Sequence, residues 1–249
     1  MSQAPMAAGR YSEGEFRVGH VLSRTFQVLS RNLLPFCVVT AIAYLPTLYF
    51  LAEQQQAVST EHAFRLIGLS SILSIALNAL SEAIVLFGAF EDMRGRPVNL
   101  MASLRVGLNR LFPVLGVAIL MSLCIGIAAI LLIIPAFIVM TMLFVAMPVC
   151  IVEQLGPAKS LSRSAELTKG HRWAIFGLWF LVMIIIGIGS KVVGAVGLLI
   201  GGIGISLILS LIWGALAGAF NAIMVVVAYH DLRVVKEGID TDQIASVFD

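Results

Sequence analysis

Residues 111–152 have the sequence LFPVLGVAILMSLCIGIAAILLIIPAFIVMTMLFVAMPVCIV, a run of 42 residues without a charged side chain. As a helix the run would extend roughly 63 Å, twice the hydrocarbon thickness of a bilayer, which is about 30 Å. It therefore predicts two membrane crossings. We expect the break at Ile133-Ile134-Pro135, because proline disfavours helix in the residue before it and donates no backbone hydrogen bond. A kink within one helix is the alternative.

The rest of the chain has the same character. Its 249 residues are 59% hydrophobic and 12% charged, against about 45–50% and 25% in soluble domains. Four further segments are long and apolar enough to span, namely 33–51, 66–90, 173–190 and 205–229. We predict an all-α polytopic membrane protein with six transmembrane helices arranged as three hairpins. The glycine-rich run 194–204 is expected to form an outer loop or a short re-entrant piece.

The distribution of basic residues predicts the orientation. Fourteen of the 16 Lys and Arg residues fall on one side of the six predicted spans. By the positive-inside rule both termini are then cytoplasmic. This divides the chain into a cytoplasmic N-terminal segment at 1–32, a membrane domain at 33–229 and a cytoplasmic tail at 230–249, with the first span as an uncleaved anchor.

Each predicted hairpin follows a basic stretch that is compatible with a helix, at 18–31, 100–110 and 157–172. Apolar residues of the first stretch share one helical face, so each hairpin is expected to follow a cytoplasmic amphipathic helix that lies in the membrane plane. The alternative is a connector whose apolar face packs on the ends of the spans. Basic residues of or beside these stretches are predicted to contact anionic lipid headgroups, namely Arg17, Arg24, Arg31, Arg105, Arg110, Lys159, Arg163, Lys169 and Arg172.

One part of the sequence resembles a known bacterial pattern. Residues 147–153 are MPVCIVE, 156–164 are GPAKSLSRS and 167–173 are LTKGHRW. This pattern resembles the membrane domain that accompanies some glycerophosphoryl diester phosphodiesterases, and the related YciC-type inner-membrane proteins. The resemblance implies a six-span module of the bacterial inner membrane. The 20 residues after Tyr229 leave no room for the hydrolase domain, so phosphodiesterase chemistry is not expected.

Glu82 is the acidic residue that falls inside a predicted span. It precedes Glu91 by nine residues, which places it about 13 Å into the hydrocarbon. Asn78 lies one turn earlier on the same face, and Asn221 in the sixth span is a candidate partner for either residue. The patch predicts a proton relay or a headgroup contact. The alternative is a protonated or hydrogen-bonded Glu82 that holds the second span against a neighbouring helix.

Small residues recur every fourth position in the sixth predicted span, at Ser210, Gly214, Gly218 and Ala222. Such a face lets another helix approach closely, so we assign it to helix packing.

No residue pattern carries catalysis. The three cysteines lie in apolar runs, and neither they nor the four histidines have metal-ligand spacing, so no metal site, cofactor or disulfide is expected. The net charge of +2 is too small to predict nucleic-acid binding. We favour a non-catalytic membrane scaffold or lipid-associated organising module, bound to anionic lipids and to partner proteins or a second copy. The alternative is a small transporter or lipid-handling protein that uses the patch around Glu82.

Overall fold

In the computed structural model, which describes residues 16–55 and 60–238, every regular element is a helix. The helices are α1 (Val18–Arg31), α2 (Leu33–Gln55), α3 (Thr60–Met93), α4 (Leu100–Asn109), α5 (Leu111–Leu131), α6 (Ile133–Met142), α7 (Ala146–Val152), α8 (Pro157–Leu167) and α9 (Arg172–Glu237). The all-helical prediction is therefore confirmed for these residues. Parts of the predicted N-terminal segment (1–15) and tail (239–249) lie outside them.

The uncharged run divides into two helical segments, as expected. The break falls at Leu132, where the backbone is extended (φ −167°, ψ 151°), one residue before the predicted Ile133-Ile134-Pro135 turn. Pro135 instead occupies the first turn of α6, where a missing N–H leaves no intrahelical hydrogen bond unmade. Proline thus marks the start of the second segment, and the chain has already turned before it.

The glycine-rich run differs from the prediction, because it remains helical almost throughout. α9 contains 66 residues and departs from helical backbone at Gly201 (φ −156°, ψ 27°) and Gly202 (φ 68°, ψ −157°). The positive φ at Gly202 is a conformation that glycine adopts without steric cost. The expected boundaries at Ser190 and Ile205 are therefore wrong: both arms continue to a two-residue turn.

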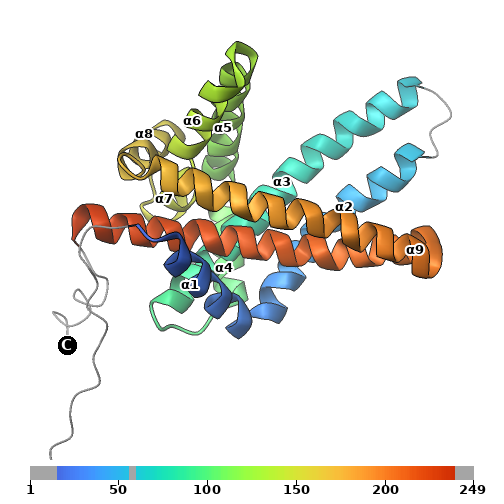
Figure 1. Cartoon of the computed structure of the whole chain (residues 1–249), viewed down its shortest axis with the longest axis horizontal. Helices are drawn as coiled ribbons and strands as arrows, with labels where there is room; N and C mark the ends of the chain where they lie inside the picture. Colours follow the sequence, from blue (N-terminus) through green and yellow to red (C-terminus); the bar gives the residue numbers. More distant parts are fainter. Residues whose placement is uncertain (1–15, 56–59, 239–249) are drawn as a thin grey trace, which may run out of the picture.

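The two arms of α9, residues 172–200 and 203–237, pack against each other as an antiparallel hairpin (Figure 1, orange and red). Ser206 Oγ donates to the Gly194 carbonyl at 3.1 Å, and Trp213 Nε1 donates to Ser190 Oγ at 3.0 Å. A Cβ atom added at Gly197 would lie 2.5 Å from Ser206 Cα. Glycine at position 197 therefore permits the backbones to touch.

The helices α1 and α2 meet at Asn32 with a bend of 91° between them. α1 buries Val21, Val28 and Leu29, and its contacts are made mainly with α9. The ring centroids of Phe26 and Phe220 lie 5.0 Å apart. The structure therefore favours the second alternative for stretch 18–31, in which its apolar face packs on protein.

Several helices suit a membrane. Among the described residues, four helical segments are long and apolar enough to cross one, at Leu73–Met93, Leu111–Leu131, Ile133–Val152 and within Arg172–Glu237; the bent pair of α1 with residues 33–46 adds a fifth if it counts as one span. Large apolar side chains remain exposed at the tip of the α5–α6 hairpin and at the turn of α9, including Ile130 and Leu199 at 87% each. Exposed apolar surface of this kind is stable in lipid.

The buried core lies where α3 and the second arm of α9 cross. It includes Leu86 on α3 and Ile223 and Tyr229 on α9, all fully buried. Figure 1 shows the α5–α6 hairpin and the α2–α3 pair leading away from α9 in different directions. The candidate site lies beside this core, where α2, α3 and α9 come together.

Candidate functional site: a polar cavity between α2, α3 and α9

A cavity of about 160 Å³ lies between three helices. It is lined by Thr40 and Tyr44 of α2, by Asn78, Ser81 and Glu82 of α3, and by Gly214, Gly218, Asn221 and Ala222 of α9. The structure therefore brings Asn78, Glu82 and Asn221 to one cavity. It is large enough for several water molecules, each of which occupies about 30 Å³ in the liquid.

The cavity follows from helical spacing. Asn78 and Glu82 lie one turn apart on α3, and Thr40 and Tyr44 lie one turn apart on α2, so each pair shares a helical face. The small residues of α9 provide the space between these faces. Ser210, the remaining residue of the predicted packing face, does not line the cavity.

Gly214 and Gly218 lie against α2 with different tolerances. A Cβ atom at Gly214 would lie 2.9 Å from Cε1 of Tyr44, whereas one at Gly218 would lie 3.7 Å from Cβ of Thr40, an ordinary contact. Thr40 Oγ1 also donates to the Ala215 carbonyl at 2.8 Å. The predicted small face of α9 is thus the surface that α2 approaches.

This contact gives a matched pair of variants. Gly214→Ala displaces the Tyr44 ring and should destabilise the protein by about 1–2 kcal/mol, whereas Gly218→Ala should be neutral or slightly stabilising. Reversible unfolding of the purified protein in mixed detergent micelles measures both. Equal effects of the two substitutions would contradict the close approach at Gly214.

The Glu82 carboxylate has no cationic partner in the described part of the chain, and it forms no hydrogen bond there. Arg65 is on the same helix but 17 residues away, which is about 25 Å along its axis. A carboxylate at this depth is costly unless it is protonated, paired or hydrated. Among the described residues, Glu82 therefore lacks the ionic or hydrogen-bonding partner that a carboxylate inside a membrane needs.

Ser81 supports the same conclusion. Its side chain is 5% exposed, and its Oγ atom is buried without a hydrogen-bond partner among the described residues. Asn78 Nδ2 donates to the Ser74 carbonyl at 2.7 Å, so its Oδ1 oxygen is left as an acceptor. Buried polar groups are nearly always hydrogen-bonded, so the Ser81 hydroxyl is unsatisfied in this arrangement of the helices.

A second polar cluster lies at the predicted cytoplasmic end of the helices. We call it the Arg163 cluster, and it consists of Glu153, Arg163, Tyr229, Arg233 and Glu237. Arg163 Nε lies 3.2 Å from Glu153 Oε2, and Tyr229 Oη donates to Glu153 Oε1 at 3.0 Å. Arg163 also pairs with Glu237, to which Arg233 donates at 2.8 Å. The cluster holds α8 and the end of α7 against the end of α9, and sequence spacing alone gave no signal for it.

A further contact ties α1 to α9. His20 Nδ1 lies 2.8 Å from Asp231 Oδ2, and Arg24 Nη1 lies 4.0 Å from Asp231 Oδ1. Burial opposes ionisation of Asp231, but the neighbouring His230 and His20 side chains outweigh it and lower the pKa of this carboxyl group. Asp231 therefore holds α1 as a carboxylate.

The predicted lipid-contacting residues fall into two groups. Arg24 and Arg163 pair with acidic side chains, and Arg110 Nη2 donates to Gln154 Oε1 at 2.7 Å. The side chain of Arg172 is partly buried. The remaining five are exposed, namely Arg17, Arg31, Arg105, Lys159 and Lys169. Their exposure is compatible with the predicted headgroup contact.

Helix α4 retains an unpartnered apolar face. Ser103 and Gly107 are buried, and a Cβ atom at Gly107 would contact Leu80 and Ile84 of α3. The opposite face leaves Met101 74% and Leu108 52% exposed, with Arg105 also exposed. The stretch 100–110 thus packs through small residues, and its large apolar residues remain available to lipid.

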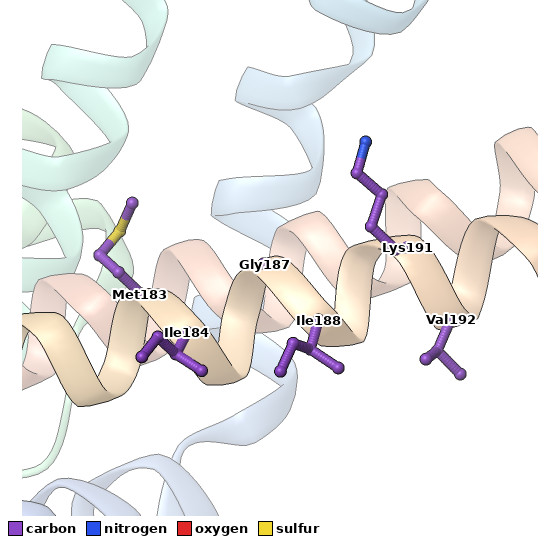
Figure 2. A pocket seen from close by; sticks show the side chains of 6 residues that line it. All are labelled: Met183, Ile184, Gly187, Ile188, Lys191 and Val192. Carbon is purple, nitrogen blue, oxygen red and sulfur yellow. The ribbon is translucent and has the colours of Figure 1, made fainter.

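A wider hollow of about 630 Å³ lies on the first arm of α9. Figure 2 shows that its six lining residues come from one helix, with Met183 and Lys191 pointing to one side and Ile184, Ile188 and Val192 to the other. One helix cannot enclose a ligand, and Lys191 is its one charged group. We therefore treat it as lipid-facing surface.

The part of the chain that the structure describes has no group of three or more His, Cys, Asp or Glu residues placed to hold a metal ion. Comparison with protein families, with characterised proteins and with solved structures finds no match to this chain. Function is therefore inferred from the chemistry of the cavity itself.

Proposed function

We propose that the protein is a small transporter or lipid-handling protein that receives a small polar group in the cavity around Glu82. The supporting observation is that Glu82 and Asn78 of α3 and Asn221 of α9 line one cavity. Ionisable groups inside a membrane commonly mark substrate or proton pathways. The unpartnered Ser81 hydroxyl adds to this, because a helix-packing contact would be expected to satisfy it.

The topology that we propose has six crossings arranged as three hairpins. Counting the two arms of α9 separately adds a sixth crossing to the five segments described above. The location of 14 of the 16 basic residues favours cytoplasmic termini. The resemblance to the phosphodiesterase-associated membrane domain favours a bacterial inner membrane, and we propose no enzymatic activity.

A membrane scaffold is the second candidate, and α4 is the observation that favours it. Exposed Met101 and Leu108 beside Arg105 form the amphipathic surface expected of an in-plane helix on anionic lipid. Under this hypothesis the protein would organise lipids, partner proteins or a second copy, and Glu82 would serve packing alone.

Liposome reconstitution separates the two functions. Wild-type protein should carry protons or scramble fluorescent phospholipids between leaflets, and Glu82→Gln should reduce the rate at least tenfold, because it removes the charge that is central to the cavity. Glu166→Gln, which alters an exposed carboxylate on α8, should retain the wild-type rate.

A different result would favour the scaffold. If wild-type and Glu82→Gln liposomes showed the same background flux while the protein still bound anionic vesicles, transport and lipid handling through the cavity would be wrong. Size-exclusion chromatography of both variants shows whether a loss of flux reflects loss of assembly.

A further inference from the structure

Resting on the proposed function, we infer that the cavity binds a small monovalent cation, either an alkali-metal ion or a primary ammonium group. The lining offers hydroxyl oxygens from Thr40, Tyr44 and Ser81, amide groups from Asn78 and Asn221, and the carboxylate of Glu82. No Lys, Arg or His is among its lining residues. The cavity therefore has one carboxyl group, negative when ionised, and several neutral oxygen donors.

Charge selects the class of ligand. An anion would be repelled by the Glu82 carboxylate, and a neutral ligand would leave that charge uncompensated in the hydrocarbon. A single positive charge neutralises a single carboxylate, so a monovalent cation matches better than a divalent one. The described residues also lack the group of three or more acidic or imidazole side chains that a transition metal would favour.

The oxygen atoms that line the cavity favour the same class of ligand, because they can coordinate a cation. Hard cations and ammonium groups take oxygen ligands, and here these come from three helices. Thr40 Oγ1 donates its one proton to a backbone carbonyl, with those of Ala215, Phe36 and Cys37 all within reach. Asn78 Nδ2 donates to the Ser74 carbonyl, so both side chains keep oxygen lone pairs for a cation. Ser81 Oγ is buried and has no partner in the described part of the chain.

The cavity is also reachable. Asn78 and Gly218 are exposed, whereas Thr40 and Ser81 are buried. The exposed pair forms the mouth of the cavity, and the buried pair forms its inner wall. A volume of about 160 Å³ accommodates a small cation together with a few water molecules.

Thermal unfolding of the full-length protein in detergent tests the inference. Sodium chloride and methylammonium chloride are titrated separately, with N-methylglucamine chloride keeping the ionic strength constant. At least one of the two cations should raise the Tm of wild-type protein in a saturable manner, because a ligand that binds the native state stabilises it. Glu82→Gln should abolish the shift, and the exposed carboxylate variant Glu166→Gln should retain it.

A second variant covers the case in which Glu82→Gln does not fold. Ser81→Ala keeps the carboxylate but removes one oxygen ligand, and it should weaken the apparent Kd about tenfold, since one such interaction contributes about 1–1.5 kcal/mol. An unchanged Kd in Ser81→Ala, or a retained shift in Glu82→Gln, would overturn the site.

Neutral and anionic probes separate this inference from the proposed function. If acetamide or acetate raised the Tm in a Glu82-dependent manner and neither cation did, the cavity would bind a polar group but the cation assignment would be wrong. If no probe shifted the Tm while Glu82-dependent flux persisted in liposomes, the cation assignment would again be wrong and the proposed function would stand.

Discussion

Gly197→Ala should destabilise the protein by about 3 kcal/mol, the largest effect that we expect from a single added methyl group. The added Cβ would lie 2.5 Å from Cα and 2.9 Å from the amide nitrogen of Ser206. Both are backbone atoms of the opposite arm of α9, so no side-chain rotation relieves the overlap. The two arms must separate near the turn, which also weakens the hydrogen bond from Ser206 Oγ to Gly194.

Gly187→Ala is the matched control, because a Cβ atom at this position has no neighbour within 4 Å. It lies on the same arm and should be neutral or slightly stabilising, since alanine favours a helix over glycine. Reversible unfolding in mixed micelles, followed by tryptophan fluorescence, measures both variants. Equal stability of Gly187→Ala and Gly197→Ala would mean that the arms are not in backbone contact.

Arg163→Ala should destabilise the protein by about 2 kcal/mol. It removes the cation shared by Glu153 and Glu237, whose side chains are only 17% and 21% exposed. Hydrogen bonds to charged groups each contribute about 1.5–3 kcal/mol, and partial exposure here keeps the loss in the lower half of that range. α8 should then detach more readily from α9, and the 153–156 segment should be cleaved faster by a protease.

Arg105→Ala is the control for this prediction, because Arg105 is an exposed arginine that forms no ion pair with an acidic side chain among the described residues. Its stability should be that of the wild type. The double variant Arg163→Ala with Glu153→Gln should lose less than the two single variants together, since both remove the same ion pair. Strict additivity would show that Arg163 and Glu153 do not interact.

The general architecture was predictable because lipid restricts the chain strongly. An uncharged run of 42 residues is about twice as long as one crossing needs, and Pro135 located the break between its two helical segments to within one residue. The run 194–204 was mispredicted because glycine usually signals a loop. In an apolar medium each backbone N–H needs a partner, and the helix therefore persists until Gly201 and Gly202.

The candidate site was predictable only in part. Asn78 and Glu82 follow from their spacing on one helix, but Thr40 and Tyr44 join them only because α2 packs on Gly214 and Gly218. Which helices touch is not encoded in local periodicity. The Arg163 cluster was missed for the same reason, since Arg163 and Glu237 are 74 residues apart in sequence.

The proposed function requires a Glu82 cavity that is hydrated and reachable, rather than one sealed by helix packing. Cysteine placed at Ser81, with Cys37, Cys124 and Cys150 replaced by alanine, tests this directly in membranes. A small cationic methanethiosulfonate reagent should label Ser81→Cys, and Glu82→Gln in the same background should slow the labelling. If Ser81→Cys stayed unlabelled in folded protein while an exposed control, Ser162→Cys, reacted fully, the cavity would be closed and the account contradicted.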